Sequence, residues 1–164
     1  MPLVFVCLFS ILPPGTSVTD TEELTFADVP WGVEADVVTA RLTAVGFSLR
    51  TKGDDGNLVF LGNVNNHNAI VLAWMAQGQL VRFSVRLLTV AAEVELVYED
   101  TRRRLEDAHG EPIRDLAPSG TLAAFWRRGE NDAFVKVSTE QTVDISYESA
   151  AWRAEFERLM KRRQ

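Results

Sequence analysis

The chain is poor in the residues that most enzymes and metalloproteins use for chemistry. It has one cysteine, Cys7, and two histidines, His67 and His109. Because Cys7 lies in an apolar leader, the rest of the chain has no thiol, which excludes thiol catalysis and cysteine-based metal sites there. We expect His67 at an exposed hairpin tip and His109 at a helix C-terminus, and neither as a catalytic group.

Motifs that carry catalysis or cofactor binding are also missing. The sequence has no G-x-S-x-G, H-E-x-x-H, Walker or G-x-G-x-x-G pattern. The acidic run Asp54-Asp55 followed by Gly56 and Asn57 has the composition of a hairpin turn and lacks the ligand spacing of a calcium loop. We therefore expect no enzyme activity, no cofactor and no metal.

An excess of positive charge is lacking too. Lys and Arg number 17 against 23 Asp and Glu, for a net charge of −6. Nucleic-acid-binding proteins usually have the opposite balance, so we expect no nucleic-acid partner. The basic run Arg102 to Arg104 is flanked by acids, and helical spacing pairs Glu99 with Arg103 and Asp100 with Arg104. We interpret this run as an ion-paired helix face.

Charge is absent from the first nineteen residues, since the first charged residue is Asp20. Residues 3–12 are an apolar run, too short to span a bilayer, and prolines, Gly15 and small residues follow. This order is typical of a secretory signal. We expect a leader over residues 1–17, cleavage near Val18, and export to the periplasm or outside the cell. The alternative is a buried N-terminal strand in a cytoplasmic protein.

Hydrophobic periodicity predicts an α+β domain with several helices and strands. The expected helices are 33–45, 93–109 and 150–161, and the expected strands are 24–32, 47–51, 58–64, 69–76, 80–88, 122–127, 133–138 and 142–148. Gly46 and Gly110 are expected to end the first two helices.

The order of elements recurs at an offset of 64 positions, so that Gly46 matches Gly110 and Phe83 matches Tyr147. We therefore predict a single domain over 24–164. It comprises two helix-plus-antiparallel-meander repeats, 24–88 and 89–148, and a C-terminal helix at 149–164. The repeats are expected to form one sheet with helices packed on one face.

The strand patterns also predict which residues face away from the helices. Arg82 and Arg86 alternate with apolar residues, as does Asp144 in the last strand. In strand 69–76 both faces are apolar, so one of them is either covered by a further layer, such as the C-terminal helix or the leader, or exposed to a partner. The candidate partner surface is Ile70, Leu72, Trp74, Arg82, Arg86, Phe134 and Asp144.

A family resemblance rests on a set of structural motifs. They are Phe26 to Gly32, Leu42 to Phe47, Phe60-Leu-Gly62, Tyr98, Leu105 and His109-Gly-Glu-Pro112. Over about residues 24–148 the chain resembles a group of bacterial envelope proteins. The architecture is similar to the tandem-repeat fold of the β-lactamase inhibitor protein and the SmpA/BamE outer-membrane assembly proteins. The resemblance implies this fold and carries over no functional residue.

Three functions are compatible with these observations. The first is a non-enzymatic protein-binding or assembly module that binds its partner through an open antiparallel sheet face. Such a module would be a monomer or a weak homodimer. The second is a carrier of a small apolar ligand or lipid, which requires a cavity between sheet and helices. The third is a hydrolase with dispersed carboxylates such as Asp144.

Overall fold

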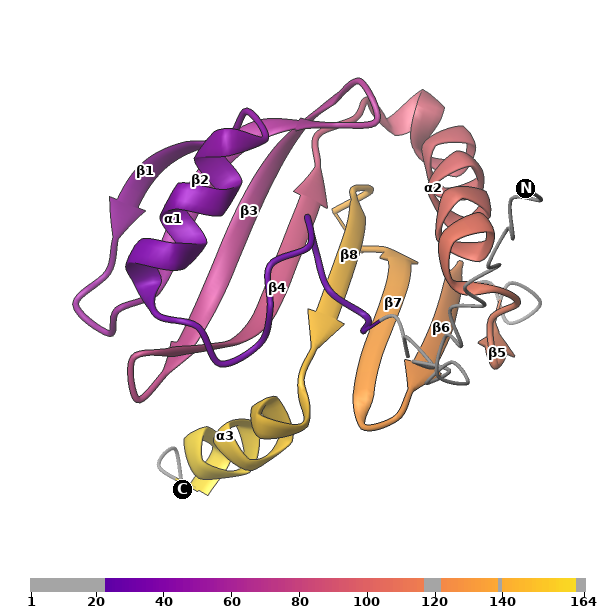
Figure 1. Ribbon diagram of the computed structural model, residues 1–164. Helices are drawn as coiled ribbons and strands as arrows, with labels where there is room; N and C mark the ends of the chain where they lie inside the picture. The colour runs from indigo at the N-terminus through magenta and orange to yellow at the C-terminus, as the bar shows by residue number, and fades with distance from the viewer. Residues whose placement is uncertain (1–22, 117–121, 139, 162–164) are drawn as a thin grey trace, which may run out of the picture.

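Alternation of apolar and polar residues along the chain produces one antiparallel sheet of eight strands (Figure 1). The computed structural model describes residues 23–116, 122–138 and 140–161. The strands are β1 (Ser48–Lys52), β2 (Leu58–Val64), β3 (His67–Ala76), β4 (Gln79–Leu87), β5 (Arg114–Asp115), β6 (Ala123–Arg128), β7 (Asn131–Val137) and β8 (Val143–Glu148). The helices are α1 (Ala35–Ala44), α2 (Val94–His109, preceded by the 3-10 turn Ala91–Glu93) and α3 (Ala150–Lys161). The predicted α+β class is confirmed, whereas the leader at 1–17 lies outside the described residues.

The strand order is β1-β2-β3-β4-β8-β7-β6-β5, which places both predicted meanders in one sheet. They meet where β4 pairs with β8, and there Phe83 lies opposite Tyr147, the residue 64 positions later. The two halves differ in detail, because α1 has 10 residues and α2 has 16, and β1 has 5 residues and β5 has 2. That the halves are copies of one unit therefore stays a prediction.

Both α1 and α2 cover the same face of the sheet (Figure 1). Helix α1 contacts β1 and β4, whereas α2 contacts β7 and β8. Four apolar residues of the two helices and four of β4 and β8 are all buried. They comprise Val38, Leu42, Val97 and Leu105 on the helices and Val81, Val85, Ile145 and Tyr147 on the strands. All except Val81 belong to one hydrophobic core cluster. The predicted facing of β4 and β8 is thus confirmed for Val85, Ile145 and Tyr147.

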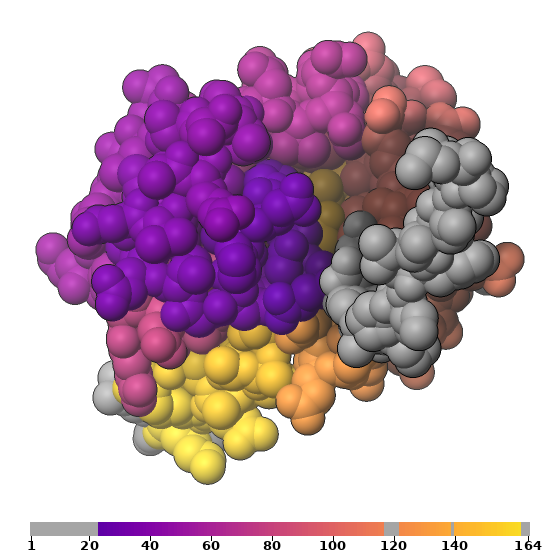
Figure 2. Space-filling view, viewed as in Figure 1, coloured from indigo at the N-terminus to yellow at the C-terminus, as the bar shows by residue number. Residues whose placement is uncertain are grey.

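The prediction of a strand at 24–32 is wrong. Ala27 and Asp28 both have a φ of 53°, and Val29 donates a turn hydrogen bond to the carbonyl of Phe26. Such dihedrals, followed by Pro30, are incompatible with a strand. The segment instead packs as an irregular layer on the sheet, with Leu24 and Val29 fully buried. Figure 2 shows this segment beside α1 on the helical side of the molecule.

An aromatic cluster forms where this segment meets the centre of the sheet. The ring of Phe26 lies 5.4 Å from that of Phe83 and 6.0 Å from that of Tyr147, measured between centroids. The ring of Trp31 lies 6.1 Å from that of Phe83, again between centroids. The irregular segment therefore fills the space between α1 and α2 and belongs to the hydrophobic core.

Helices α1 and α2 end at the predicted glycines. Gly46 and Gly110 have φ values of 96° and 78°, which residues with a side chain rarely adopt.

The prediction of His67 at an exposed hairpin tip is wrong. Asn65 and Asn66 form the hairpin turn, and the partly buried His67 begins β3.

The basic run on α2 is ion-paired, although with one different partner. Asp100 accepts hydrogen bonds from both Arg103 and Arg104. Arg103 thus pairs with Asp100 and not with Glu99. No helix in the described ranges is long and apolar enough to cross a membrane.

Candidate functional site

The face of the sheet that lies away from α1 and α2 is called here the open face. Strand pairing arranges its central residues in three rows that run across the strands. The first row is Leu61, Ile70, Arg86, Asp144, Lys136 and Ala123. The second is Val59, Leu72, Ser84, Ser146, Phe134 and Phe125, and the third is Trp74, Arg82, Glu148, Asp132 and Arg127.

A groove of about 340 Å³ lies along the middle of the open face, and we call it the serine groove. Its floor contains the two small residues Ser84 and Ser146, which lie opposite each other on β4 and β8. Ile70 and Leu72 form one wall, and Phe134 forms the other. Small side chains between large ones create the hollow, because neighbouring side chains on one face of a sheet stand side by side.

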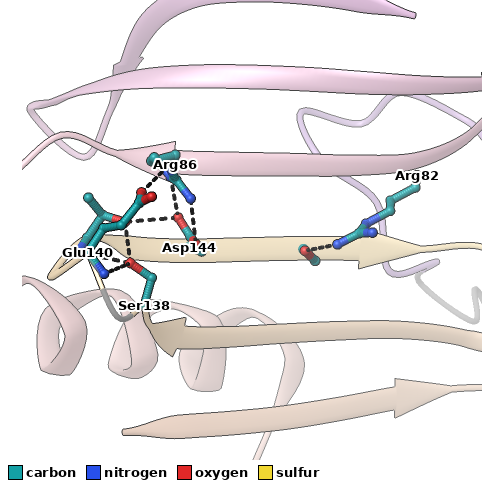
Figure 3. Close-up of polar contacts among 7 residues, drawn as sticks. Arg82, Arg86, Ser138, Glu140 and Asp144 are labelled. Carbon is teal, nitrogen blue, oxygen red and sulfur yellow. Dashed lines mark hydrogen bonds and ion pairs between the residues drawn. The ribbon is translucent and has the colours of Figure 1, made fainter. Parts of the chain in front are cut away.

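Ion pairs between β4 and β8 cross the serine groove on either side of the two serines. Figure 3 shows the pairs that Arg86 makes with Asp144 and Glu140. Arg86 donates from Nε and Nη2 to the two carboxylate oxygens of Asp144, at 2.9 and 3.2 Å. Glu140 accepts a further bond from Arg86 Nη1 at 2.7 Å. Two-point pairing of this kind fixes the guanidinium plane as well as its position. The Asp144 carboxylate is therefore engaged in an ion pair.

The other ion pair joins Arg82 to Glu148 and is better shielded from solvent. Arg82 Nε lies 3.3 Å from Glu148 Oε1, and the side chains are 21% and 19% exposed. Arg82 Nη2 donates to Ser146 Oγ at 3.0 Å, which ties the pair to the groove floor. Burial raises the pKa of Glu148 and the Arg82 charge lowers it. Burial likewise lowers the pKa of Arg82, and the Glu148 charge raises it.

Helix α3 covers the end of the open face beyond Arg82. Its Trp152 is 5% exposed, and the ring lies 5.5 Å from that of Trp74. The guanidinium carbon of Arg82 lies 4.7 Å from the centre of the Trp152 ring, a cation–π contact. Ser149 anchors the start of α3, since its amide and hydroxyl both donate to the carbonyl of Val81. The C-terminal helix thus covers Trp74 and leaves Ile70 and Leu72 beside the groove.

A second hollow continues the open face toward β5. It has a volume of about 490 Å³ and shares Phe134 and Lys136 with the serine groove. Phe125 lies directly opposite Phe134, and Arg114 lies opposite Phe125. The hollow is therefore a second apolar patch with cations at its border.

The seven residues of the candidate partner surface do share one face of the sheet. Six of them line the serine groove, and Trp74 lies at its α3 end. The candidate partner surface left out Ser84, Ser146, Phe125, Lys136 and Trp152. The two serines had a signal, because they occupy the same alternating positions as Arg82 and Asp144. Trp152 had none, because its contact with Trp74 joins segments far apart in the chain.

The described residues offer little for metal or acid–base chemistry. In the ranges that the structure describes, no group of three or more His, Cys, Asp or Glu side chains has the proximity that a metal ion requires. Asp144, the carboxylate considered for hydrolysis, is held by Arg86. What the open face can do is present apolar side chains together with hydroxyl and charged groups to another molecule.

Comparison with protein-family models, with curated proteins and with solved structures found no match to this chain.

Proposed function

We propose that this chain is a non-catalytic protein-binding or assembly module that binds its partner in the serine groove of the open face. The observation that carries the proposal is the groove itself, in which Ile70, Leu72 and Phe134 flank two serines. Interfaces combine apolar contacts with a few oriented polar groups, and this surface offers both.

The sheet face is also built to hold its shape. The ion pairs of Arg82 and Arg86 connect β4 to β8 on both sides of the serines. A surface whose side chains are already fixed loses less conformational entropy on binding. Rigid backbone pairing beneath the groove adds to this, since β4 and β8 pair without a break from Arg82 to Leu87.

The alternative of a lipid or small-ligand carrier has less support. A carrier of the kind expected would hold its ligand between the sheet and the helices. In the described residues that space contains buried core side chains, among them Leu42, Phe83 and Tyr98. We therefore favour the open face over the sheet–helix interface as the binding region.

Export belongs to the same proposal and rests on the apolar run before Asp20. A role in envelope assembly is what the resemblance to SmpA/BamE proteins implies for an exported chain. We expect N-terminal sequencing of the native protein to begin near Val18. A chain that still begins at Met1 or Pro2 would argue against export and leave the groove proposal untouched.

The binding proposal is tested with a charged substitution in the groove wall. We expect Phe134→Lys to reduce capture of the partner by at least about tenfold, because a cation replaces a buried apolar contact. Tagged full-length protein is used to capture partners from its own host, and quantitative mass spectrometry compares the variants. The matched control is Leu96→Lys on α2, where the native side chain is 73% exposed.

Support for the proposal is a protein that the native chain and Leu96→Lys retain and Phe134→Lys loses. That protein is then purified and its Kd measured against all three chains. Circular dichroism establishes that both variants fold. Equal Kd values for folded Phe134→Lys and the native chain would overturn the proposal.

A further inference from the structure

Positive charge gathers around the serine groove although the chain has a net charge of −6. Three cations line the groove, Arg82, Arg86 and Lys136, against the single carboxylate of Asp144. The adjoining hollow is lined by Arg114, Arg127 and Lys136 and by no carboxylate. Both hollows of the open face are therefore lined by more cations than carboxylates.

Most of these cations already have an acidic partner. Arg82 pairs with Glu148, Arg86 with Asp144 and Glu140, and Arg127 with Asp132. Lys136 and Arg114 are the exceptions, since neither has an ion pair within the described ranges. Both side chains are exposed. Two uncompensated cations therefore remain on this face.

These two cations border the aromatic part of the surface. Lys136 is two residues from Phe134 on β7, so both side chains point to the same face. Arg114 lies opposite Phe125, which in turn lies opposite Phe134. Lys136 and Arg114 are on strands separated by one other strand, a distance of about 10 Å across the sheet.

We propose that the partner recognised by the serine groove is an acidic, aromatic protein segment, an inference that rests on the proposed function. A large apolar side chain of this segment enters between Leu72 and Phe134, above the two serines. Asp or Glu residues two and four positions along the segment, which share the face of the apolar side chain in an extended chain, pair with Lys136 and Arg114. Residues two apart in an extended segment are roughly 7 Å apart, which suits side chains that reach both cations.

Charge complementarity and hydrogen bonding both support an acidic segment as the occupant. Opposite charges at the rim of an apolar groove raise the association rate and orient the partner. The serine hydroxyls accept bonds from Arg82 and from Trp74 Nε1, and their own protons can be donated to an acceptor of the segment.

A nucleic acid also combines negative charge with rings but fits this surface less well. Carboxylates of Asp144, Glu140 and Glu148 lie along the same face, where they would repel a continuous row of phosphates. A peptide can place its acids only where cations await them. Nucleic acid is accordingly a rival outcome of the test.

The test compares two peptides of equal length and aromatic content, acetyl-Phe-Ser-Glu-Ser-Glu-amide and acetyl-Phe-Ser-Lys-Ser-Lys-amide, in which the ring and the charges share one face of an extended chain. Each is titrated into the ¹⁵N-labelled full chain, and amide shifts report both affinity and location. We expect the acidic peptide to shift amides of Ser84, Ser146 and Lys136 and to bind at least about tenfold more tightly than the basic one. High salt should weaken the binding of the acidic peptide.

Charge reversal supplies the control. Lys136→Glu should weaken the acidic peptide by about tenfold or more, whereas Lys52→Glu on β1 makes the same change of net charge far along the sheet and should have little effect. An eight-residue oligothymidylate is titrated in parallel.

Three outcomes would overturn the inference: tighter binding of the basic peptide, tighter binding of the oligonucleotide, or no shift at the groove with either peptide. None of these decides the proposed function, because that depends on whether Phe134→Lys loses its protein partner.

Discussion

Replacing Phe83 with Ala is expected to lower the free energy of unfolding by about 3 to 5 kcal/mol. Phe83 is fully buried at the junction of the two meanders. Its ring contacts Phe26 and Trp31 of residues 24–32, the entry segment, and its strand neighbours are Ala73 on β3 and Tyr147 on β8. Truncation therefore leaves a cavity that three separate parts of the chain border. Closing such a cavity would require the sheet and the entry segment to move together, which the rigid packing opposes.

Chemical denaturation of the native and Phe83→Ala proteins measures this difference. The matched control is Phe156→Ala on α3, because that ring is 50% exposed and its loss should cost less than about 1 kcal/mol. Similar losses for the two variants would show that the junction is not the centre of the core.

The second large effect is expected from Arg82→Leu, which should lower the free energy of unfolding by about 2 to 4 kcal/mol at pH 7. The substitution leaves the Glu148 carboxylate partly buried without its cation. It also removes the hydrogen bond to Ser146 and the contact with the Trp152 ring. Loss of that ring contact should loosen α3, which near-ultraviolet circular dichroism of the tryptophans would detect.

The loss of stability in Arg82→Leu should depend on pH, and the pKa of Glu148 determines the direction of that dependence. Burial raises this pKa above the ordinary value, and removing Arg82 raises it further. A carboxyl whose pKa is higher in the folded state binds more protons there, so stability is lost as pH rises through the folded pKa. The difference between Arg82→Leu and native protein should therefore grow as pH rises through the folded pKa of Glu148. Below that pKa it should fall to the cost of the lost contacts with Ser146 and Trp152.

Two variants make this prediction specific. Adding Glu148→Gln to Arg82→Leu should remove the pH dependence, because no carboxylate is left to titrate at this position. Arg103→Leu is the control for loss of an arginine, since its pair with Asp100 is exposed and worth at most about 1 kcal/mol. A pH-independent loss in Arg82→Leu would contradict the role given to Glu148.

Both expected effects bear on the binding proposal, because they concern the structure beneath the open face. Phe83 fixes the strand junction from the core side, and the Arg82–Glu148 pair fixes it from the groove side. A folded Arg82→Leu protein should keep Leu72 and Phe134 in the groove walls. Partner binding to this variant therefore distinguishes the contribution of the groove floor from that of the apolar walls.

The sequence by itself determined the local structure and the facing of the strands. Alternation along β4 and β8 placed Arg82 and Asp144 on one face, because the side-chain period of a strand is two residues. Gly46 and Gly110 marked the ends of α1 and α2, because a positive φ is accessible to glycine at little cost. These features depend on short-range sterics, so a few neighbouring residues suffice to predict them.

The irregular conformation of the entry segment could not be predicted from such short-range sterics. Its apolar residues have the spacing of a short strand, yet Ala27 and Asp28 have left-handed dihedrals. The turn hydrogen bond from Val29 to Phe26 and the burial of Leu24 and Val29 against the sheet stabilise this conformation. The energy that selects this conformation comes from contacts distant in the chain, which local propensity does not contain.

Only the tertiary structure decided which apolar surface is covered and where a partner could bind. Strand 67–76 has two apolar faces, and nothing local distinguishes them. Pairing of β4 with β8 places Ser84 against Ser146 and so creates the groove, while Trp152 covers Trp74 and leaves Leu72 accessible. The groove and its ion pairs join residues about 60 positions apart, and their juxtaposition follows from strand order, which the local sequence pattern does not specify.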